Sequence, residues 1–148
     1  MKDSKGICPF CRIVRGDDPA ARLVYQDPHT AAFFPINPAT LGHTLVVPRT
    51  HIPEIWDLDE ESAVLLTQAT LLIAHVTRRT FKPDGLNIIQ SNGEAASQTV
   101  PHLHVHVVPR WKNDAMGDIW PTETIFSKDE QDRAWKILRK ECQKEASI

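Results

Sequence analysis

The sequence predicts an α+β fold, in which a mostly antiparallel sheet carries helices on one side. Two observations predict it. Short apolar segments bounded by turn residues outnumber helical segments, and one long segment in the middle of the chain repeats its apolar residues with a helical period. The length of 148 residues suits a single domain over residues 1–148, in which 113–148 form a C-terminal extension of loop and helix.

Five strands are expected, over residues 22–26, 30–34, 43–47, 86–90 and 102–108. An Asp27-Pro28 turn joins the first two, because both residues favour turns. Pro48 and Pro109 are expected to end the third and the fifth strand, since proline has no backbone N–H for the ladder. Residues 35–42 and 91–98 are expected to be loops.

Two helices are expected, one long and central over residues 59–80 and one C-terminal over 128–144. Asp59 is a suitable N-cap for the first, and acidic residues follow it in the first turn, where the helix dipole favours them. The predicted core-facing stripe consists of Val64, Leu65, Leu72, Ile73 and Val76. Ser127 and Glu130 have the spacing of a capping box for the second helix.

Charge and apolar content argue against two classes of protein. A formal net charge of -2 does not suit a protein that coats nucleic acid. No apolar run approaches the roughly 20 residues of a membrane helix. Residues 1–6 lack the apolar core of a signal peptide, so a cytoplasmic location is expected. Three cysteines do not suit a secreted disulfide framework, and the Cys8-x-x-Cys11 pair favours metal binding.

The segment from His102 to Val108 carries the most chemical information. Histidine alternates in it with Leu103, Val105 and Val107, so on a strand the three histidines lie on the face opposite these apolar residues. Three groups that titrate near neutrality are unfavourable side by side unless they have a function. Paired histidines on a strand can bind zinc. A neutral imidazole whose other nitrogen is hydrogen-bonded can instead attack phosphorus as a nucleophile.

The pattern His-φ-His-φ-His-φ-φ, where φ is apolar, resembles the signature of the histidine triad family of nucleotide hydrolases and transferases. Three further segments resemble other parts of that family. They are the Gly-His strand Leu41–Pro48 with the following Arg49-Thr50-His51, the phosphate-contacting loop Ser91–Val100, and the N-terminal Cys8-Pro9-Phe10-Cys11 of many bacterial members. The resemblance implies a meander sheet and a homodimer joined through the long helix and a sheet edge.

The resemblance, which extends from Ile7 to Lys112, also implies roles for individual residues. His104 is the expected nucleophile, and the other expected catalytic residues are His106 and His43. The residues expected to bind the nucleotide are Ile36, Asn37, Asn92, Gln98, Thr99, His104 and His106. Of these, Gln98, Thr99 and His106 are expected to contact the phosphate oxygens, with Asn92 close to the phosphate.

A structural zinc ion is a further implication of the resemblance. Family members with the Cys-x-x-Cys bind zinc away from the chemistry, and the matching ligands here are Cys8, Cys11, His51 and His102. Two thiolates and two imidazoles form the closed tetrahedral set that structural zinc prefers. One alternative is a reduced cysteine pair that holds no metal. Another is a catalytic zinc held by the triad, whose removal would abolish activity while the fold stays intact.

Two positions depart from the family's pattern. The family has Asp or Asn eight residues before the Gly-His histidine to bind the ribose hydroxyls. This chain has Pro35 there, and Asn37 is expected to take over that role. The family's loop has glycine before the glutamine, where this chain has Ser97. Because a side chain disfavours a positive φ, a differently shaped loop is expected.

The expected function is hydrolysis of a nucleotide derivative at its α-phosphate, through a covalent nucleotidyl-histidine, with release of a nucleoside monophosphate. The segment Pro109–Asp114 resembles the fragile histidine triad branch, so the expected substrate is an AMP-containing dinucleoside polyphosphate. A nucleoside phosphoramidate is the nearest enzymatic alternative. A nucleotide-binding regulator with little turnover is the alternative outside enzymes, and an intact His104 argues against it.

Overall fold

The computed structural model describes residues 8–146, and the chain divides between Gly117 and Asp118 into two compact units. The first unit contains five strands, the helices α1 (Pro9–Arg15) and α2 (Glu60–Phe81), and two short 3-10 helices, η1 (Ile55–Asp57) and η2 (Glu94–Ala96). The second unit contains α3 (Lys128–Glu145). Within the described part of the chain, no helix has the length and apolar character needed to cross a membrane.

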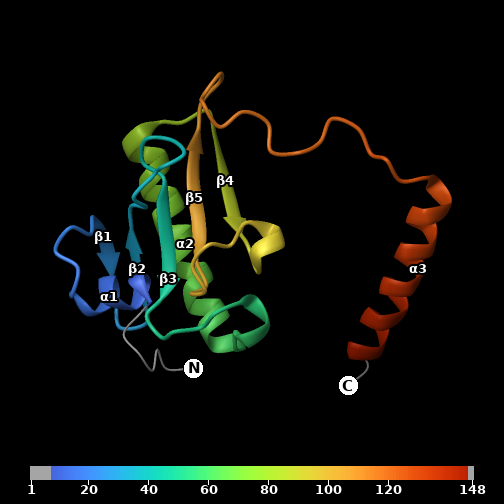
Figure 1. Ribbon diagram of the computed structural model, residues 1–148, viewed down its shortest axis with the longest axis horizontal. Helices are drawn as coiled ribbons and strands as arrows, with labels where there is room; N and C mark the ends of the chain where they lie inside the picture. The colour runs from blue at the N-terminus through green and yellow to red at the C-terminus, as the bar shows by residue number, and fades with distance from the viewer. Residues whose placement is uncertain (1–7, 147–148) are drawn as a thin grey trace. The chain divides into compact units, whose positions relative to one another are not determined.

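The five strands form one antiparallel sheet, as predicted (Figure 1). They are β1 (Leu23–Gln26), β2 (Thr30–Phe33), β3 (Thr44–Pro48), β4 (Gly85–Gln90) and β5 (Val105–Arg110), in the order β1-β2-β3-β5-β4. The first three strands follow one another as a meander. The chain then passes through α2 to the edge strand β4, and β5 fills the place between β3 and β4. The predicted α+β class is confirmed.

The helix α2 lies along the sheet and begins where the sequence predicts (Figure 1). The Asp59 carboxylate accepts a hydrogen bond from the Ser62 backbone N–H at 2.8 Å, which caps the helix. Its buried residues are Leu66, Ala69, Ile73 and Thr77. The predicted stripe was therefore wrong except at Ile73 and at the half-buried Leu65. Apolar residues cover so much of this helix that their period did not specify the buried side.

The two faces of the sheet carry different packing. The α2-side face contains apolar residues that pack against α2, with Ala32, Val46 and Val107 completely buried. The α1-side face packs Phe33, Leu45 and other apolar residues against α1. Leu45 pairs with His106 and Val46 pairs with Val105. Since residues paired across strands share a face, the triad histidines lie on the α1-side face, as predicted.

The strand bounds around the prolines differ from those predicted. β3 includes Pro48 and β5 includes Pro109. The Pro48 carbonyl faces the His102 ring at 2.8 Å, and the Pro109 carbonyl accepts from the Thr40 hydroxyl at 2.6 Å. In an antiparallel strand the N and C=O of one residue face the same side. Each proline nitrogen therefore faces a side where no ladder continues, and its missing N–H costs no pairing.

The fifth strand begins later than predicted, at Val105 and not at His102. In the segment before it, His102 and Leu103 use their backbone in other contacts. Leu103 N–H donates to the Ile52 carbonyl at 2.6 Å, and His102 N–H donates to the Val100 carbonyl at 2.8 Å. The His102 carbonyl faces a side chain, that of His104. These contacts hold the segment beside the sheet and not in its ladder.

The short helix α1 was not predicted, although its end signals are present in the sequence. Cys8 is the N-cap and its sulfur accepts from Cys11 N–H at 3.4 Å, Pro9 follows in the first turn, and Gly16 ends the helix with φ of 81°. Proline at the start and glycine just past the end are typical of a helix. The Cys-x-x-Cys pattern was interpreted only as a metal motif.

The second unit begins its helix with the predicted capping box. The Ser127 hydroxyl contacts the Glu130 backbone N–H at 3.2 Å, and the Glu130 carboxylate accepts from the Ser127 backbone N–H at 2.8 Å. Trp135 is 54% exposed on this helix, and the Arg139 guanidinium lies 5.5 Å from the centre of its ring.

Candidate active site and metal centre

His104 is buried just before β5 with one ring nitrogen fixed by a hydrogen bond. Its Nδ1 lies 2.7 Å from the His102 carbonyl oxygen. A carbonyl oxygen only accepts, so Nδ1 carries the proton and Nε2 keeps its lone pair. Burial lowers the pKa of His104 below its ordinary value of 6.5, against the opposing effect of this hydrogen bond. A neutral imidazole with a free Nε2 is a competent nucleophile.

A second chain of hydrogen bonds fixes the other two rings of the site. The Ala39 backbone N–H donates to Nδ1 of His43 at 3.0 Å, so the proton of His43 is on Nε2. That Nε2 lies 2.9 Å from Nδ1 of His106 and donates to it. His106 therefore carries its own proton on Nε2. The backbone thus determines an unprotonated Nε2 at His104 and an N–H donor at His106, whose ring centres are 4.9 Å apart.

Burial keeps both of these accessory histidines neutral. It is the main cause that lowers the pKa of His43, and neighbouring His104 adds to the effect. Burial, followed by the proximity of His104 and His43, lowers the pKa of His106 to about 4. Three imidazoles this close cannot all carry charge, so the neutral forms and their fixed tautomers prevail near neutral pH.

The Gly-His dipeptide before β3 is positioned by a close approach to α2. Gly42 has a φ of 90°, and a Cβ at this position would lie 2.7 Å from the ring of Phe81. Only glycine accommodates both the left-handed conformation and this contact. The end of α2 thereby sets where the backbone turns into β3 and places His43 beside His106.

The histidines line a cavity of about 420 Å³ whose remaining lining is mostly apolar. Its volume and character suit a small organic ligand with a few polar contacts. Six residues predicted to act in catalysis or nucleotide binding line it, namely Ile36, Asn37, His43, Thr99, His104 and His106. Pro35 lines it as well, and the charged side chains in the lining are those of Asp18 and Arg22.

Two other residues predicted to bind the nucleotide use their side chains inside the protein. Asn92 accepts from the Ile55 backbone N–H at 2.7 Å and exchanges hydrogen bonds with the Gln90 amide at 2.9 and 2.7 Å. Gln98 contacts the backbone of Gly93, Pro53 and Val100. Neither Asn92 nor Gln98 lines the cavity.

The loop keeps a positive φ at the position where serine replaces glycine. Ser97 has φ of 68° and ψ of 23°, a left-handed conformation that ends η2. The substitution was expected to reshape the loop because a side chain disfavours this region. Ser97 nevertheless adopts a positive φ, and a difference in loop shape from the family stays a prediction.

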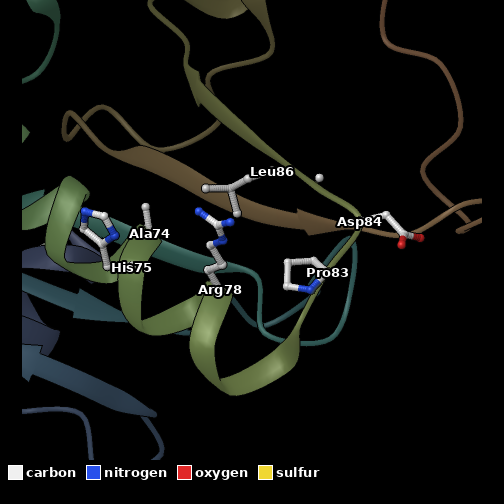
Figure 2. A pocket seen from close by; sticks show the side chains of 7 residues that line it. Ala74, His75, Arg78, Pro83, Asp84 and Leu86 are labelled. Atoms are coloured by element: carbon white, nitrogen blue, oxygen red, sulfur yellow. The ribbon is translucent and has the colours of Figure 1, made fainter.

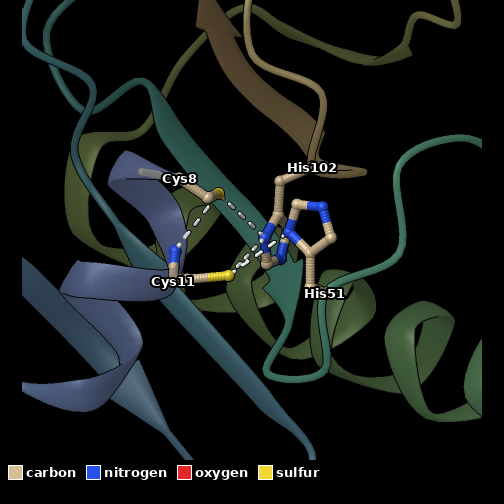
Figure 3. A group of neighbouring side chains, drawn as sticks. All are labelled: Cys8, Cys11, His51 and His102. Atoms are coloured by element: carbon tan, nitrogen blue, oxygen red, sulfur yellow. Dashed lines mark hydrogen bonds between the residues drawn. The ribbon is translucent and has the colours of Figure 1, made fainter. Parts of the chain in front are cut away.

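The four residues predicted as metal ligands gather in one place (Figure 3). The ligand atoms of Cys8, Cys11, His51 and His102 all lie within 4.8 Å of one another. Nε2 of His102 faces the Pro48 carbonyl at 2.8 Å and so carries the proton. The lone pair is then on Nδ1, which lies 3.5 Å from both cysteine sulfurs. The donor set, the burial and the tautomer fit a four-coordinate metal ion.

This metal group is separate from the His104 ring but linked to it through one residue. Among the described residues, the candidate ligand cluster contains His102 and contains neither His104 nor His106. The alternative of a catalytic metal held by the whole triad is therefore not favoured by the geometry. His102 contributes its ring to the metal group and its carbonyl to His104, so the two sites share a backbone position.

The helix α1 supplies site residues that sequence reasoning missed. The ring of Phe10 stands edge-on to that of His104, with centres 5.1 Å apart, and to that of His102 at 5.9 Å. Phe10 and Ile13 both line the cavity. The Pro9 and Gly16 signals could have revealed the helix, but nothing in its sequence indicated that it covers the histidines.

A second hollow lies between the end of α2 and β4, away from these histidines (Figure 2). His75 and Arg78 line it from α2, Pro83 and Asp84 from the connection to β4, and Leu86 from β4 itself. None of the residues that line this hollow also lines the histidine cavity.

Comparison with known proteins gives a consistent picture. The HIT domain matches residues 18–113. The chain is 44% identical over 124 residues to protein hit of Bacillus subtilis, which covers 83% of this chain and 85% of that protein. It is 34% identical over 123 residues to adenosine 5'-monophosphoramidase hnt1 of Schizosaccharomyces pombe, covering 82% and 89%. It is 30% identical over 118 residues to adenylylsulfatase HINT3 of Arabidopsis thaliana, covering 80% of this chain and 58% of that protein.

Solved structures agree with the sequence matches. A crystal structure of a HIT family member from Bacillus subtilis superposes with a TM-score of 0.81 at 38% identity, covering 90% of this chain and 96% of that chain. A zinc-bound histidine triad family protein from Mycobacterium smegmatis superposes with a TM-score of 0.70 at 38% identity, covering 79% and 84%. The family match contains the histidine row, all five strands and most of the residues that line the cavity, and this chain belongs to the HIT domain family.

Proposed function

We propose that this protein hydrolyses derivatives of AMP by attack of His104 Nε2 on the α-phosphorus. The observation that carries the proposal is the fixed tautomer of His104, whose proton is held on Nδ1 by the His102 carbonyl. The lone pair on Nε2 belongs to a ring that lines the cavity. The names of relatives support the reaction class, since one is an adenosine 5'-monophosphoramidase and another an adenylylsulfatase.

The proposed chemistry has two displacement steps. In the first, a bond forms between His104 Nε2 and phosphorus while the bond from phosphorus to the leaving group breaks. The hydrogen bond from Nδ1 to the His102 carbonyl stabilises the positive ring that results. In the second, water attacks phosphorus, the P–N bond breaks and AMP leaves. Over both steps the hydroxide of one water ends on phosphorus and its proton on the leaving group.

The N–H of His106 supplies a hydrogen-bond donor beside the reacting phosphorus. Its Nε2 proton is fixed because Nδ1 accepts from His43. In a cavity with mostly apolar walls, such a donor stabilises negative charge that develops on a phosphoryl oxygen or on the leaving group. Thr99, which lines the same cavity, is proposed as a second contact to the phosphate.

Among substrates, phosphoramidates and adenylyl sulfate are better supported than dinucleoside polyphosphates. The polyphosphate hypothesis depends on residues 109–114, and none of these lines the cavity. Arg110 instead contacts Asp114 at 2.7 and 2.9 Å and Asn87 at 2.6 Å. Arg22 is the cation of the cavity lining, so a long phosphate chain would meet little positive charge there.

The metal group is proposed to hold structural zinc through Cys8, Cys11, His51 and His102. Two sulfur and two nitrogen ligands leave no open position for substrate, and the zinc-bound relative from Mycobacterium smegmatis supports the identity of the metal. Bound there, the ion would join α1 and the segment before β5, both of which contribute to the cavity. It would supply stability and no chemical step.

A homodimer is proposed through α2 and the edge strand β4. Val64 and Leu71 on α2 are 55% and 57% exposed, and Ile88 on β4 is 50% exposed. Apolar residues on a helix beside an unpaired strand edge suit association with a second copy. Sedimentation of the wild type should show a dimer that Leu71→Glu weakens; a wild-type monomer at micromolar concentration would contradict the proposal.

The test of function is release of AMP from adenosine 5'-phosphoramidate, adenylyl sulfate and a diadenosine polyphosphate. Wild type should hydrolyse at least one of the first two, and His104→Ala should lose at least about 10³-fold in turnover while staying folded. His29→Ala, which changes an exposed histidine remote from the cavity lining, is the matched control and should keep wild-type turnover. Full activity of His104→Ala would refute the mechanism. AMP binding without any turnover would instead indicate a nucleotide-binding regulator.

A further inference from the structure

The loop from Ser91 to Val100 is closed by the side chain of one residue, Gln98. The Gly93 backbone N–H donates to Oε1 of Gln98 at 2.7 Å. Nε2 donates to the Pro53 carbonyl at 2.9 Å and to the Val100 carbonyl at 3.1 Å. A carboxamide has two N–H donors, so both are occupied within the protein. Neither is left for the phosphate of a substrate.

These contacts fasten the loop to the segment that follows His51. Pro53 lies two residues beyond that histidine, and Asn92 binds the next part of the same segment through the Ile55 N–H at 2.7 Å. The backbone beyond the loop is held to this segment as well, by the hydrogen bond from Leu103 N–H to the Ile52 carbonyl. The loop is thus attached to residues 52–55 on both sides of Gln98.

The backbone of the loop requires such attachment. Ser97, directly before Gln98, has a φ of 68°, which costs free energy in any residue with a side chain. Regular structure within the loop is limited to the single turn η2. A strained, irregular segment adopts one conformation only where surrounding contacts over-determine it. The three side-chain hydrogen bonds of Gln98 span this strained residue, from Gly93 before it to Val100 after it, together with the hydrogen bond from the Gln98 backbone N–H to the Gly93 carbonyl at 3.1 Å.

The residues that Gln98 holds in place are those that reach the cavity. Thr99 and Val100 line it together with His104 and His106, while Gln98 does not. No described residue forms a hydrogen bond with the Thr99 hydroxyl, and Thr99 is exposed. The polar side chain through which the loop lines the cavity is therefore that of Thr99, which is adjacent to Gln98.

We infer that Gln98 is a positioning residue, which fixes the loop so that Thr99 faces the phosphate site without itself contacting the substrate. The inference rests on the proposed function for its catalytic consequence. It replaces the expectation that the Gln98 side chain binds a phosphate oxygen. In the free protein the loop is then already formed, so that binding does not have to order it.

The test compares Gln98→Met with wild type in the absence and the presence of substrate. Methionine has similar length and no charge but removes all three hydrogen bonds. In the free protein, hydrogen exchange of the Gly93 amide should accelerate by about tenfold or more, since its acceptor is lost. With adenosine 5'-phosphoramidate or adenylyl sulfate, kcat should fall by about ten- to a hundredfold with a smaller change in KM. The pH at which turnover declines in acid should not move.

Two further variants support the comparison. Glu94→Gln changes an exposed side chain in the same loop and should leave both Gly93 exchange and kcat at wild-type values. Gln98→Asn keeps the amide but shortens the side chain by one methylene. It perturbs the same contacts with less risk to the fold and should give changes in the same direction as Gln98→Met.

Three results would overturn the inference. One is a Gly93 amide in substrate-free Gln98→Met that exchanges hydrogen as slowly as in wild type, together with a raised KM. That result would indicate that the Gln98 side chain contacts the substrate directly. Another is faster Gly93 exchange with unchanged kcat, which shows that chemistry does not need the fixed loop. If wild type hydrolyses no AMP derivative, the proposed function fails and AMP binding provides the readout. AMP should then protect the Thr99 amide from hydrogen exchange in wild type but not in Gln98→Met. The same protection in Gln98→Met would contradict the inference.

Discussion

The two faces of the sheet differ in what their buried residues require. On the α2-side face, Ala32, Val46 and Val107 are completely buried and need only apolar neighbours. On the α1-side face, His102 and His104 are buried as deeply, at 0% and 5% exposed, but each ring needs a partner at a set position. In the segment from His102 to Val108, apolar residues therefore contribute to stability on the α2-side face, while the histidines between them supply polar groups on the α1-side face.

The difference follows from the cost of burial. Burying apolar surface is favourable wherever it occurs, whereas a buried polar group without a partner costs about 1–3 kcal/mol. The rings of His102 and His104 each face a backbone carbonyl, at 2.8 and 2.7 Å. His43 receives a backbone N–H at 3.0 Å. Those backbone partners leave little freedom in the tautomers, which is why the α1-side face can have a defined reactivity.

The largest effect on stability is expected from the α2-side face. Ile73→Ala removes a side chain that is 2% exposed in the core between α2 and the sheet. The free energy of unfolding should fall by about 2–5 kcal/mol in urea titrations, because a cavity replaces buried methyl groups. Turnover per folded molecule should stay close to wild type. A large loss of turnover in fully folded protein would show that the two faces are not separable.

Removal of the metal should have the next largest effect, and it should act on stability first. A chelator should lower the free energy of unfolding by about 3 kcal/mol for an ion present at a hundred times its dissociation constant or more. Cys11→Ser should reproduce much of this loss, because it removes a buried ligand. Cys142→Ser, at an exposed cysteine outside the metal group, is the control and should not. Turnover abolished by chelation with unchanged stability would favour a catalytic metal.

Much of this architecture could be predicted from residue patterns. Alternation in residues 102–108 predicted which side chains share a face, and the Asp59 and Ser127 caps predicted where two helices begin. These features depend on local sequence. The strand bounds at Pro48 and Pro109 could not be predicted, because they depend on which side of the strand each nitrogen faces.

Many members of the candidate site could be predicted from the sequence, but its connections could not. The metal group and six residues of the cavity lining were identified from motifs. The tautomers were not, since they depend on contacts such as that between Ala39 and His43. The contribution of Phe10 required a helix that was not predicted, and the inward contacts of Gln98 required the path of residues 52–55. The contacts of Phe10 and Gln98 are tertiary and have no local signal, whereas the contact between Ala39 and His43 depends on the turn that residues 39–43 adopt.

A smaller effect is expected where a ring acts through its neighbour. His43→Ala removes the donor that fixes the tautomer of His106, so kcat should fall by about ten- to a hundredfold, less than for His104→Ala. Steady-state kinetics with the best substrate provides the comparison, with His29→Ala again as control. A loss as large as that of His104→Ala would give His43 a direct part in the reaction.

The smallest effect is expected in the pH dependence of stability and of turnover. His106 faces His43 and His104 and shares the cavity with Asp18 and Arg22. Since burial lowers its pKa to about 4, the ring stays neutral in the folded state where an unfolded histidine takes up a proton. Its contribution to stability is full above pH 6.5 and is lost as the pH falls from 6.5 toward 4.

Turnover of the folded enzyme should depend on the folded-state pKa values of the site, which burial lowers below 6.5. It should be level from pH 8 to 6.5, and its acid limb should have an apparent pKa below 6.5, where the neutral form of the site is lost. A pH–rate profile of kcat/KM on wild type tests this. An apparent pKa at or above 6.5 for the acid limb would contradict the assignment of buried, neutral histidines.

The stereochemical course at phosphorus tests the central claim most directly. An AMP derivative with a chiral α-phosphorothioate would be hydrolysed in isotopically labelled water, and the configuration of the product determined. Attack by His104 followed by attack of water inverts phosphorus twice, so the account predicts net retention. A single displacement by water gives inversion, and that result would contradict His104 as the nucleophile.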